Sequence, residues 1–276
     1  MSRCHGSMLA GMLGPMLMAA PLAAQGERLN LTLRPAPNQV IHIGMHQEMA
    51  FTATAAGLPN PMKIDGVTSF DGVQHVGAAD AQGNLAVEMR IDSMAITVLL
   101  NGSPMPAPPL DSLKGQTVKL IYDARGQVID AQASGMNETT KASIRGLLGQ
   151  FAGSLPNTTL GVGDTVSTPL NLTLPIPMLD GSQATLQGRN LFQLTGITRE
   201  GGDRIAQLKL TTEATMSGSV VMHMTGTGTM EWNADKGYLK NGVSNMNTEM
   251  TLTMGGTTMN MTGTIRVTIT GDSKAP

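Results

Sequence analysis

Methionine is the residue type with the most distinctive chemistry in this sequence, which contains 22 methionines and one cysteine. Thioether sulfur is a soft ligand that suits copper(I) in an oxidising compartment. The candidate copper(I) ligands are the segment Met222-His223-Met224 and three later methionines, Met254, Met259 and Met261. Methionine is also a flexible apolar side chain that adapts to irregular partners, so the same residues are candidates for core packing or for binding a hydrophobic ligand.

A second candidate metal site lies early in the chain, at His42, His46 and Glu48. Alternate residues of a strand share a face and lie about 6–7 Å apart, at about 3.3 Å per residue. His46 and Glu48 could therefore converge on a hard or borderline ion, whereas His42 is twice as far from His46. Because ligands are so sparse, we expect a polar strand face here in preference to a metal site.

The sequence lacks the common catalytic motifs. It contains no Gly-x-Ser-x-Gly elbow, no His-Glu-x-x-His pair and no phosphate-cradling glycine-rich loop. A Ser-His-Asp set assembled in space stays open, because its members need not be sequence neighbours. We predict a non-enzymatic protein without a cofactor.

Strands must position the methionines, because apolar and polar residues alternate from Met216 to Thr270. Successive side chains of a strand point to opposite faces, so each alternating segment has one apolar and one polar face. We predict three long strands with methionine on the apolar face, over 216–232, 245–254 and 258–269. This geometry points His223 away from its methionine neighbours, so copper(I) ligands would have to come from methionines on adjacent strands.

The remainder of the chain is also rich in strand patterns. A slip of the alternation near Ser93 predicts a β-bulge, and the Asp65-Gly66 and Asp71-Gly72 pairs predict turns. The other predicted strands cover 29–33, 41–54, 85–100, a hairpin over 118–128, 165–174, 185–194 and 204–215. Helical spacing of apolar residues occurs over 137–155, where Asn137 can cap the helix.

We therefore predict a mainly β fold, a curved antiparallel sheet or incomplete barrel built from two meander halves with one central α-helix. The expected boundaries are a signal peptide over 1–24, a first half over 25–136, a bridging helix over 137–155 and a second half over 156–276, all forming one continuous domain. The turn after Tyr122 resembles the turn after Trp232, 110 residues later. This echo motivates the hypothesis that the meander was duplicated.

The N-terminus is typical of a Sec-type bacterial signal peptide. Arg3 precedes an apolar stretch over 8–20, and Leu22-Ala23-Ala24 offers a cleavage site. We therefore expect a periplasmic or extracellular protein, whose mature chain has lost Cys4 and has no disulfide. No later apolar run is long enough for a membrane-spanning helix. The net charge of −2 and the absence of basic runs argue against nucleic-acid partners, and no protein partner is indicated.

The order of these features resembles a group of uncharacterised secreted bacterial β-rich proteins. The resemblance is carried by the long early strand, the turn at Tyr122–Gly126, the Val162-Gly163-Asp164-Thr165 turn and the closing meander. That group implies secretion and a β fold but no function. In architecture alone, the expected sheet is similar to periplasmic lipoprotein carriers, whose curved sheet shelters acyl chains beneath helices.

Three functional hypotheses follow for the methionine-lined face. The first is binding of a lipid or acyl chain in the cell envelope, the second is copper(I) binding, and the third is a structural envelope module with a closed core. The predicted ligand-binding residues are Met222, Met224, Met230, Trp232, Met250, Met254, Met259 and Met261 on the sheet, with Ile144, Leu148 and Phe151 on the helix.

Overall fold

The computed structural model describes residues 26–55, 60–106, 113–124, 126–133, 155–175, 183–217, 220–254 and 257–274. This part of the chain is almost entirely β-strand. The strands are β1 (Arg28–Asn30), β2 (Val40–Ala55), β3 (Met62–Ala79), β4 (Leu85–Leu100), β5 (Ser103–Pro104), β6 (Thr117–Tyr122), β7 (Val128–Ala133), β8 (Thr159–Gly161), β9 (Thr165–Pro175), β10 (Gln183–Glu200), β11 (Asp203–Met216), β12 (Val220–Asn233), β13 (Tyr238–Met254) and β14 (Thr257–Lys274).

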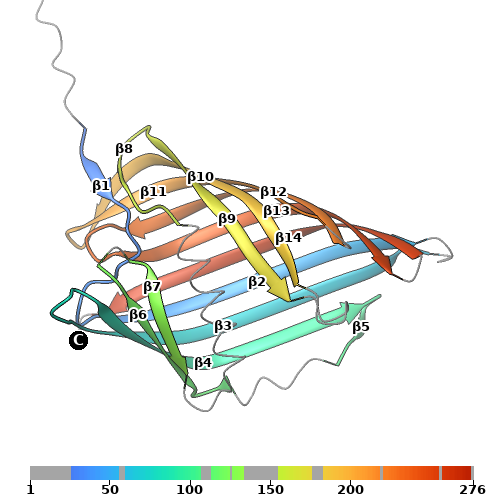
Figure 1. Cartoon of the computed structure of the whole chain (residues 1–276), viewed down its shortest axis with the longest axis horizontal. Coiled ribbons are helices and arrows are strands. Elements are labelled where there is room, and N and C mark those ends of the chain that lie inside the picture. The colour runs from blue at the N-terminus through green and yellow to red at the C-terminus, as the bar shows by residue number, and fades with distance from the viewer. Residues whose placement is uncertain are drawn as a thin grey trace, which may run out of the picture.

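Twelve of these strands form one antiparallel sheet, in the order β7-β6-β4-β3-β2-β14-β13-β12-β11-β10-β9, with β5 beside β4 (Figure 1). Two meanders meet where β2 pairs with β14 along 16 residues, from Val40 opposite Lys274 to Ala55 opposite Met259. The end strands β7 and β9 do not pair with each other, so the sheet is not closed into a barrel. The prediction of a mainly β, antiparallel and open sheet is confirmed.

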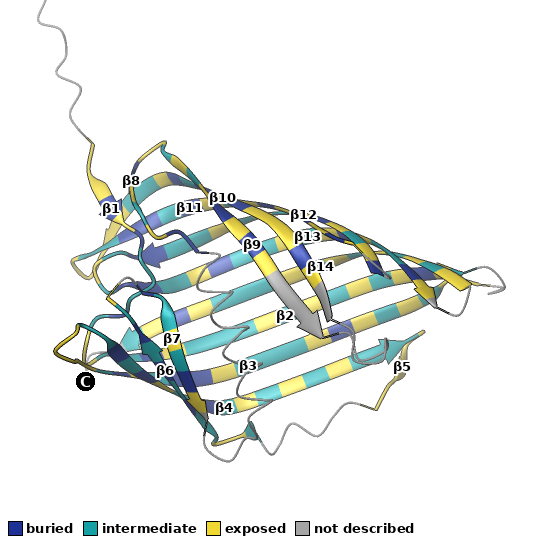
Figure 2. Cartoon of the chain, in the orientation of Figure 1, coloured by how far each residue is buried: buried dark blue, intermediate teal, exposed yellow. Residues whose placement is uncertain are grey.

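The sheet curls strongly, so that β9 at one end and β6 and β7 at the other turn over the same side (Figure 1). We call that side the inner face. Along each long strand, exposed residues alternate with buried or half-buried ones, as in the β12 segment Val221 to Met230 (Figure 2). The exposed positions form the outer face and include most of the threonines and charged residues of the long strands.

A strap formed by residues 26–39 covers the inner face near one end. Its strand β1 pairs with β8 in a separate two-stranded sheet, and Leu29 and Leu31 are fully buried. These leucines pack with Phe192, Leu194 and Trp232 from β10 and β12. Aromatic and leucine side chains with few rotamers therefore close this end of the inner face, which we call the strap end.

Two glycine turns hold the strap between them. Gly126 (φ +78°) ends the β6 turn and Gly237 (φ +67°) ends the β12 turn. A Cβ at Gly126 would lie 2.5 Å from the Leu33 carbonyl oxygen, and one at Gly237 would overlap the Arg34 carbonyl oxygen. Glycine is required at both turns by its positive φ and by this close backbone approach.

Ion pairs add to the attachment of the strap end. Arg28 of the strap lies 2.9 Å from Asp164, and Lys236 lies 2.9 Å from Asp203 at the β12 turn. A hydrogen bond from the Asn233 side chain, followed by the ion pair with Lys236, lowers the pKa of Asp203. Exposed pairs of this kind contribute little to stability individually, so the leucine and aromatic packing dominates here.

Two turn predictions are wrong. Asp65-Gly66 and Asp71-Gly72 lie inside β3, a strand that runs from Met62 to Ala79. A Cβ at Gly66 would lie 2.7 Å from Met49 Cε, and one at Gly72 would lie 2.9 Å from the Phe70 ring. These glycines make room for neighbouring side chains in a strand, which is the alternative role of glycine in β structure.

The strand predicted over 216–232 is β12, but it begins later than predicted, at Val220. Met216 is the last residue of β11 and pairs directly with Met222 across the hairpin. The predicted bulge near Ser93 is confirmed, because the β3–β4 register shifts between Asp71 opposite Ser93 and Gly72 opposite Ile91.

The described part of the chain contains no α-helix, which departs from the predicted fold class. The helix predicted over 137–155 falls on residues outside the described ranges, apart from Leu155. Leu155 itself is buried and packs with the strap cluster.

A candidate hydrophobic ligand-binding face

Methionines from four strands stand directly side by side on the inner face. Met216 of β11 pairs with Met222 of β12, Met222 with Met250 of β13, and Met250 with Met261 of β14. The row continues through Ala53 of β2 to Met62 of β3. We call the six residues the methionine ladder. Directly opposed side chains in a sheet have Cβ atoms about 4.5–5.5 Å apart, so neighbouring thioethers of the ladder are in reach of one another.

The ladder and the strands beside it are only partly covered. Met216 and Ala53 are buried, whereas Met222, Met250, Met261 and Met62 are half-buried. The same holds for apolar residues nearer the middle of the sheet, Met49, Ile265 and Val267 among them. The inner face thus retains apolar surface that the described part of the chain does not fully bury.

Large side chains on this face lie over glycines of the neighbouring strand. Met246 lies over Gly226, where a Cβ would be 2.7 Å from Met246 Cγ, and Met49 lies over Gly66 in the same way. Phe51 similarly covers Gly263. Side chains that lie flat over glycines make a thinner layer than side chains that stand upright, so they leave volume above the sheet.

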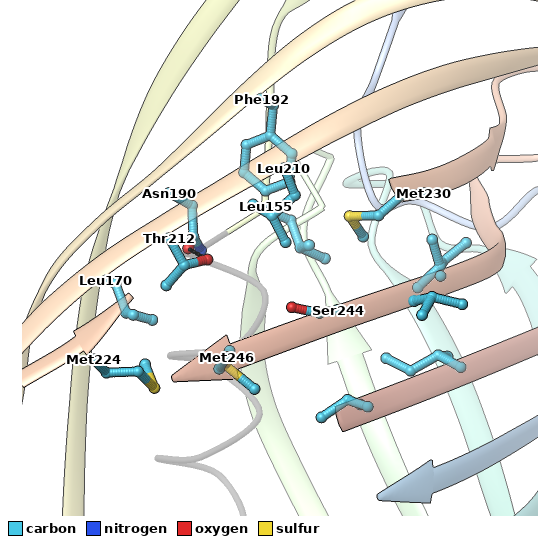
Figure 3. Close-up of a pocket in the computed structure, with 15 residues that line it drawn as sticks. Leu155, Leu170, Asn190, Phe192, Leu210, Thr212, Met224, Met230, Ser244 and Met246 are labelled. Atoms are coloured by element: carbon cyan, nitrogen blue, oxygen red, sulfur yellow. Dashed lines mark hydrogen bonds between the residues drawn. The ribbon is translucent and has the colours of Figure 1, made fainter. Parts of the chain in front are cut away.

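A cavity of about 220 Å³ lies between the strap end and the ladder (Figure 3). Residues as far apart in the sheet as Leu170 of β9 and Ile269 of β14 line it, which shows how tightly the sheet curls. The lining consists of Leu155, Leu170, Asn190, Phe192, Leu210, Thr212, Met224, Met230, Leu239, Gly242, Val243, Ser244, Met246, Val267 and Ile269.

Three polar residues interrupt this apolar lining. The Thr212 hydroxyl donates a hydrogen bond of 2.8 Å to Asn190 Oδ1, and both residues are buried. Ser244 lies across the cavity on β13, with its hydroxyl turned into the space (Figure 3). The cavity can therefore form a few hydrogen bonds within an otherwise apolar site.

Among the described residues, no charged side chain lines the cavity. Along the cavity and the ladder, the charged residues of β10 to β14 occupy alternate outer positions, for example Glu213 and Glu249, both exposed. Arg199 and Arg204 continue the inner-face register only at the strap end, beyond the cavity. Burial raises the pKa of Tyr122, a core residue of β6, to about 12, so this phenol is also uncharged at neutral pH. The cavity and the ladder therefore present a neutral, largely apolar surface.

The predicted site residues are distributed over the methionine ladder, the cavity and the strap end. Met222, Met250 and Met261 belong to the ladder, Met259 lies two residues from Met261 at the next inner-face position of β14, and Met224 and Met230 line the cavity. Trp232 is fully buried beneath the strap, away from the half-exposed surface. Met254 ends β13 opposite Thr257. Ile144, Leu148 and Phe151 lie outside the described residues.

Sequence reasoning missed the polar groups of the cavity and the contribution of β2. Asn190 interrupts an apolar alternation through Leu186, Gly188 and Phe192, which is the signal that could have singled it out. Met49 reaches the face only because β2 pairs with β14, a contact between residues far apart in the sequence.

The candidate metal residues lie on the outer face. His46 and Glu48 approach to 3.5 Å, but their side chains are 51% and 57% exposed. Throughout the described ranges, no group of three or more His, Cys, Asp or Glu residues could hold a metal ion. His223 is exposed and points away from Met222 and Met224, as the alternation predicts.

Comparison with known proteins gives structural neighbours only. No protein-family model and no curated protein sequence matches the chain. A structure described as lipid–protein interactions in lipovitellin aligns over 88% of this chain with a TM-score of 0.50 and 12% identity. The alignment covers 26% of lipovitellin, so the chain corresponds to about a quarter of that protein and shares its fold there.

Two bacterial structures align more loosely. They are the translocator domain of autotransporter NalP from Neisseria meningitidis, at 11% identity, and OccK7 (OpdD) from Pseudomonas aeruginosa, at 8%. Each covers about 85% of this chain, and each has a TM-score of 0.21. The resemblance to uncharacterised secreted β-rich proteins stays a prediction. Within the described residues, no helix has the length and apolarity needed to cross a membrane.

Proposed function

We propose that this protein is a non-enzymatic binding protein that holds a lipid or acyl chain against its inner face. The observation that carries the proposal is the half-exposed apolar surface of the ladder and the strands beside it, adjoining a largely apolar cavity. Contiguous apolar surface that stays partly exposed in a folded protein is typical of interaction sites.

The energy available is adequate for binding. Covering about 300 Å² of apolar surface would contribute about 7 kcal/mol at about 25 cal/mol per Å². Without any cost, this energy corresponds to a dissociation constant of about 10 μM. The lost freedom of the ligand offsets part of it, so micromolar binding requires a larger covered area or added hydrogen bonds. Methionine suits such a ligand because its unbranched side chain adapts to variable partners.

The likeness to lipovitellin gives independent support, because that structure is described by its lipid–protein interactions and has a similar curved sheet. The proposal also places the protein in the periplasm or outside the cell. That placement rests on the signal-like N-terminus, which includes Arg3 and the apolar stretch over 8–20.

The methionine ladder also favours copper(I) binding as a second candidate function. Met222, Met250 and Met261 are consecutive cross-strand neighbours, so three thioethers could converge on one ion. The histidine of the Met222-His223-Met224 segment would take no part, because it lies on the outer face.

Native mass spectrometry of protein purified gently from its secreted fraction tests the proposal. We expect a co-purified lipid with the wild-type protein. Met250→Gln preserves size but adds a polar group to the inner face, so it should lose most of this lipid. Glu249→Gln, one residue away on the outer face, should retain it.

A clean unliganded mass, together with no uptake of added lipid, would contradict the proposal. Met250→Leu separates the two candidates, because it removes the sulfur and keeps the apolar surface. Lipid binding should survive this change, whereas a copper(I) site measured against a competing chelator should weaken.

A further inference from the structure

We infer that the cavity selects a ligand with an uncharged hydrogen-bonding group, such as the ester or hydroxyl of a neutral lipid, and places that group between Thr212 and Ser244. This inference rests on the proposed function and specifies its ligand class. It comes from the arrangement of polar groups in the cavity, from which charged side chains are missing.

The buried Asn190–Thr212 pair forms one side of this polar site. Asn190 and Thr212 are each more than nine-tenths buried, and their hydrogen bond of 2.8 Å lies on the inner face. Buried polar side chains cost stability unless they form hydrogen bonds, and they are uncommon where a leucine would pack equally well. Their neighbours on the same strands, Phe192 and Ala214, are apolar, so the pair is a local polar patch in an apolar wall.

Ser244 forms the other side. It lies two strands away on β13 and is half-buried, and its hydroxyl has no hydrogen-bond partner among the described residues. At about 4.8 Å between neighbouring strands, Thr212 and Ser244 stand on strands about 10 Å apart. They are also offset by two residues along the strands, since Thr212 lies opposite Gly226 and Ser244 opposite Gly228. A ligand that spans this distance can accept a hydrogen bond from Ser244 and donate one to the Thr212 oxygen, whose own hydrogen is donated to Asn190.

The intervening strand leaves this space free of its own side chains. Gly226 of β12 lies opposite Thr212, and Gly228 lies opposite Ser244. The side chain over Gly226 is that of Met246, an unbranched chain that can change rotamer when a ligand enters. The polar groups are thus separated by two glycines and one adaptable side chain.

The residues that line the cavity also exclude a negatively charged ligand group. An ionised carboxylate or phosphate placed in the cavity would lose its hydration without gaining a cation, because no Lys or Arg of the described ranges lines the cavity. Such burial is strongly unfavourable, whereas an ester carbonyl or a hydroxyl needs only the hydrogen bonds available here. A charged head group would have to remain outside the cavity.

Displacement of a neutral fluorescent hydrophobic dye tests this with four ligands of equal chain length. They are a monoacylglycerol, a fatty acid methyl ester, a straight-chain alkane and the fatty acid at a pH well above its pKa. We expect the two esters to bind more tightly than the alkane and the fatty acid anion. Ser244→Ala should weaken monoacylglycerol binding by about tenfold, the effect of one lost hydrogen bond, and change alkane binding by less than about twofold.

Two further variants keep the test independent of folding. Asn190→Leu combined with Thr212→Val removes both partners of the buried bond and should reduce the preference for the monoacylglycerol over the alkane, while the part due to Ser244 remains. Ser167→Ala changes an exposed serine on β9 and should leave all affinities unchanged. Native-like emission from Trp232 would establish that each variant is folded.

The outcomes distinguish a failure of this inference from a failure of the proposed function. If the alkane binds as tightly as the esters and Ser244→Ala changes nothing, or if the anion binds best, this inference fails while hydrophobic binding stands. If no ligand displaces the dye and no lipid is retained, the proposed function fails as well.

Discussion

The strap end and the methionine ladder belong to the same sheet and the same face, yet they are packed in opposite ways. Beneath the strap, Trp232, Phe192 and Leu194 are each at most 1% exposed. Along the ladder, Met222, Met250 and Met261 stay half-buried although they alternate with polar residues just as regularly. Periodicity therefore identifies the face, and what covers the face decides whether it is a core.

The side chains of the strap end and the ladder also differ in conformational freedom. Aromatic and branched residues have few rotamers and fill a fixed volume, which suits an interior packed at crystal-like density. Methionine has three rotatable side-chain bonds and tolerates variable neighbours. The closed end thus holds the fold together, and the ladder offers a surface whose partner can vary.

Trp232→Ala should be the most damaging single change among those that test this contrast. Removal of a fully buried tryptophan leaves a large cavity and typically costs about 3–5 kcal/mol. We expect a loss of this size in the free energy of unfolding, measured by denaturant titration followed by circular dichroism. Trp232→Phe should cost much less, because the indole N–H has no hydrogen-bond partner among the described residues.

A small effect of Trp232→Ala would contradict the assignment of the strap end as the stabilising core. It would mean that the strap detaches easily and that the two regions differ less than their burial suggests.

We expect alkaline pH to lower the free energy of unfolding by an intermediate amount, through the buried Tyr122 and not through the ladder. Burial raises the pKa of Tyr122 to about 12, so the fold favours the protonated phenol. The stability from this group is therefore complete below the unfolded-state pKa of 10.0 and is lost as the pH rises toward 12. The loss reaches about 2–3 kcal/mol at about 1.4 kcal/mol per pKa unit.

Tyr122→Phe should remove this alkaline loss, which is measurable as the pH dependence of the denaturation midpoint of each protein. Equal losses in wild type and variant would assign the effect to other groups. The described inner face around the ladder contains no titratable side chain, so this region should contribute nothing to the difference.

Local sequence patterns predicted the faces of the strands well and their ends poorly. Met216 and Met222 are cross-strand partners six residues apart. Because that separation is even, the alternation continues unbroken through the hairpin, and the last residue of β11 looks like the first of β12. Gly66 and Gly72 were mistaken for turn residues, since the groups that approach them from neighbouring strands, the Met49 side chain and the Arg90 carbonyl oxygen, are not visible in a local pattern.

The candidate site was predictable as a methionine-lined face but not as a cavity. Its volume depends on the pairing of β2 with β14 and on the curl that brings Leu170 of β9 toward Ile269 of β14. These are contacts between residues far apart in the chain, which periodicity does not specify. The polar group at Ser244 likewise gains its meaning only from what lies across the sheet.

The smallest effect on stability should come from the ladder, and it is the sharpest test of the comparison. Met261→Ala removes a half-buried side chain whose surroundings can relax, so we expect a loss below about 1 kcal/mol. Leu208→Ala, on the same face but 2% exposed, should cost about 2–5 kcal/mol. The two are compared by denaturant unfolding of lipid-free protein. If lipid occupies the face, added lipid should raise the stability of wild type more than that of Met261→Ala, because a ligand that binds more tightly stabilises the folded state more at the same concentration. Equal costs for the two substitutions without lipid would show that the ladder is packed as a core, and the distinction between the two regions would then fall.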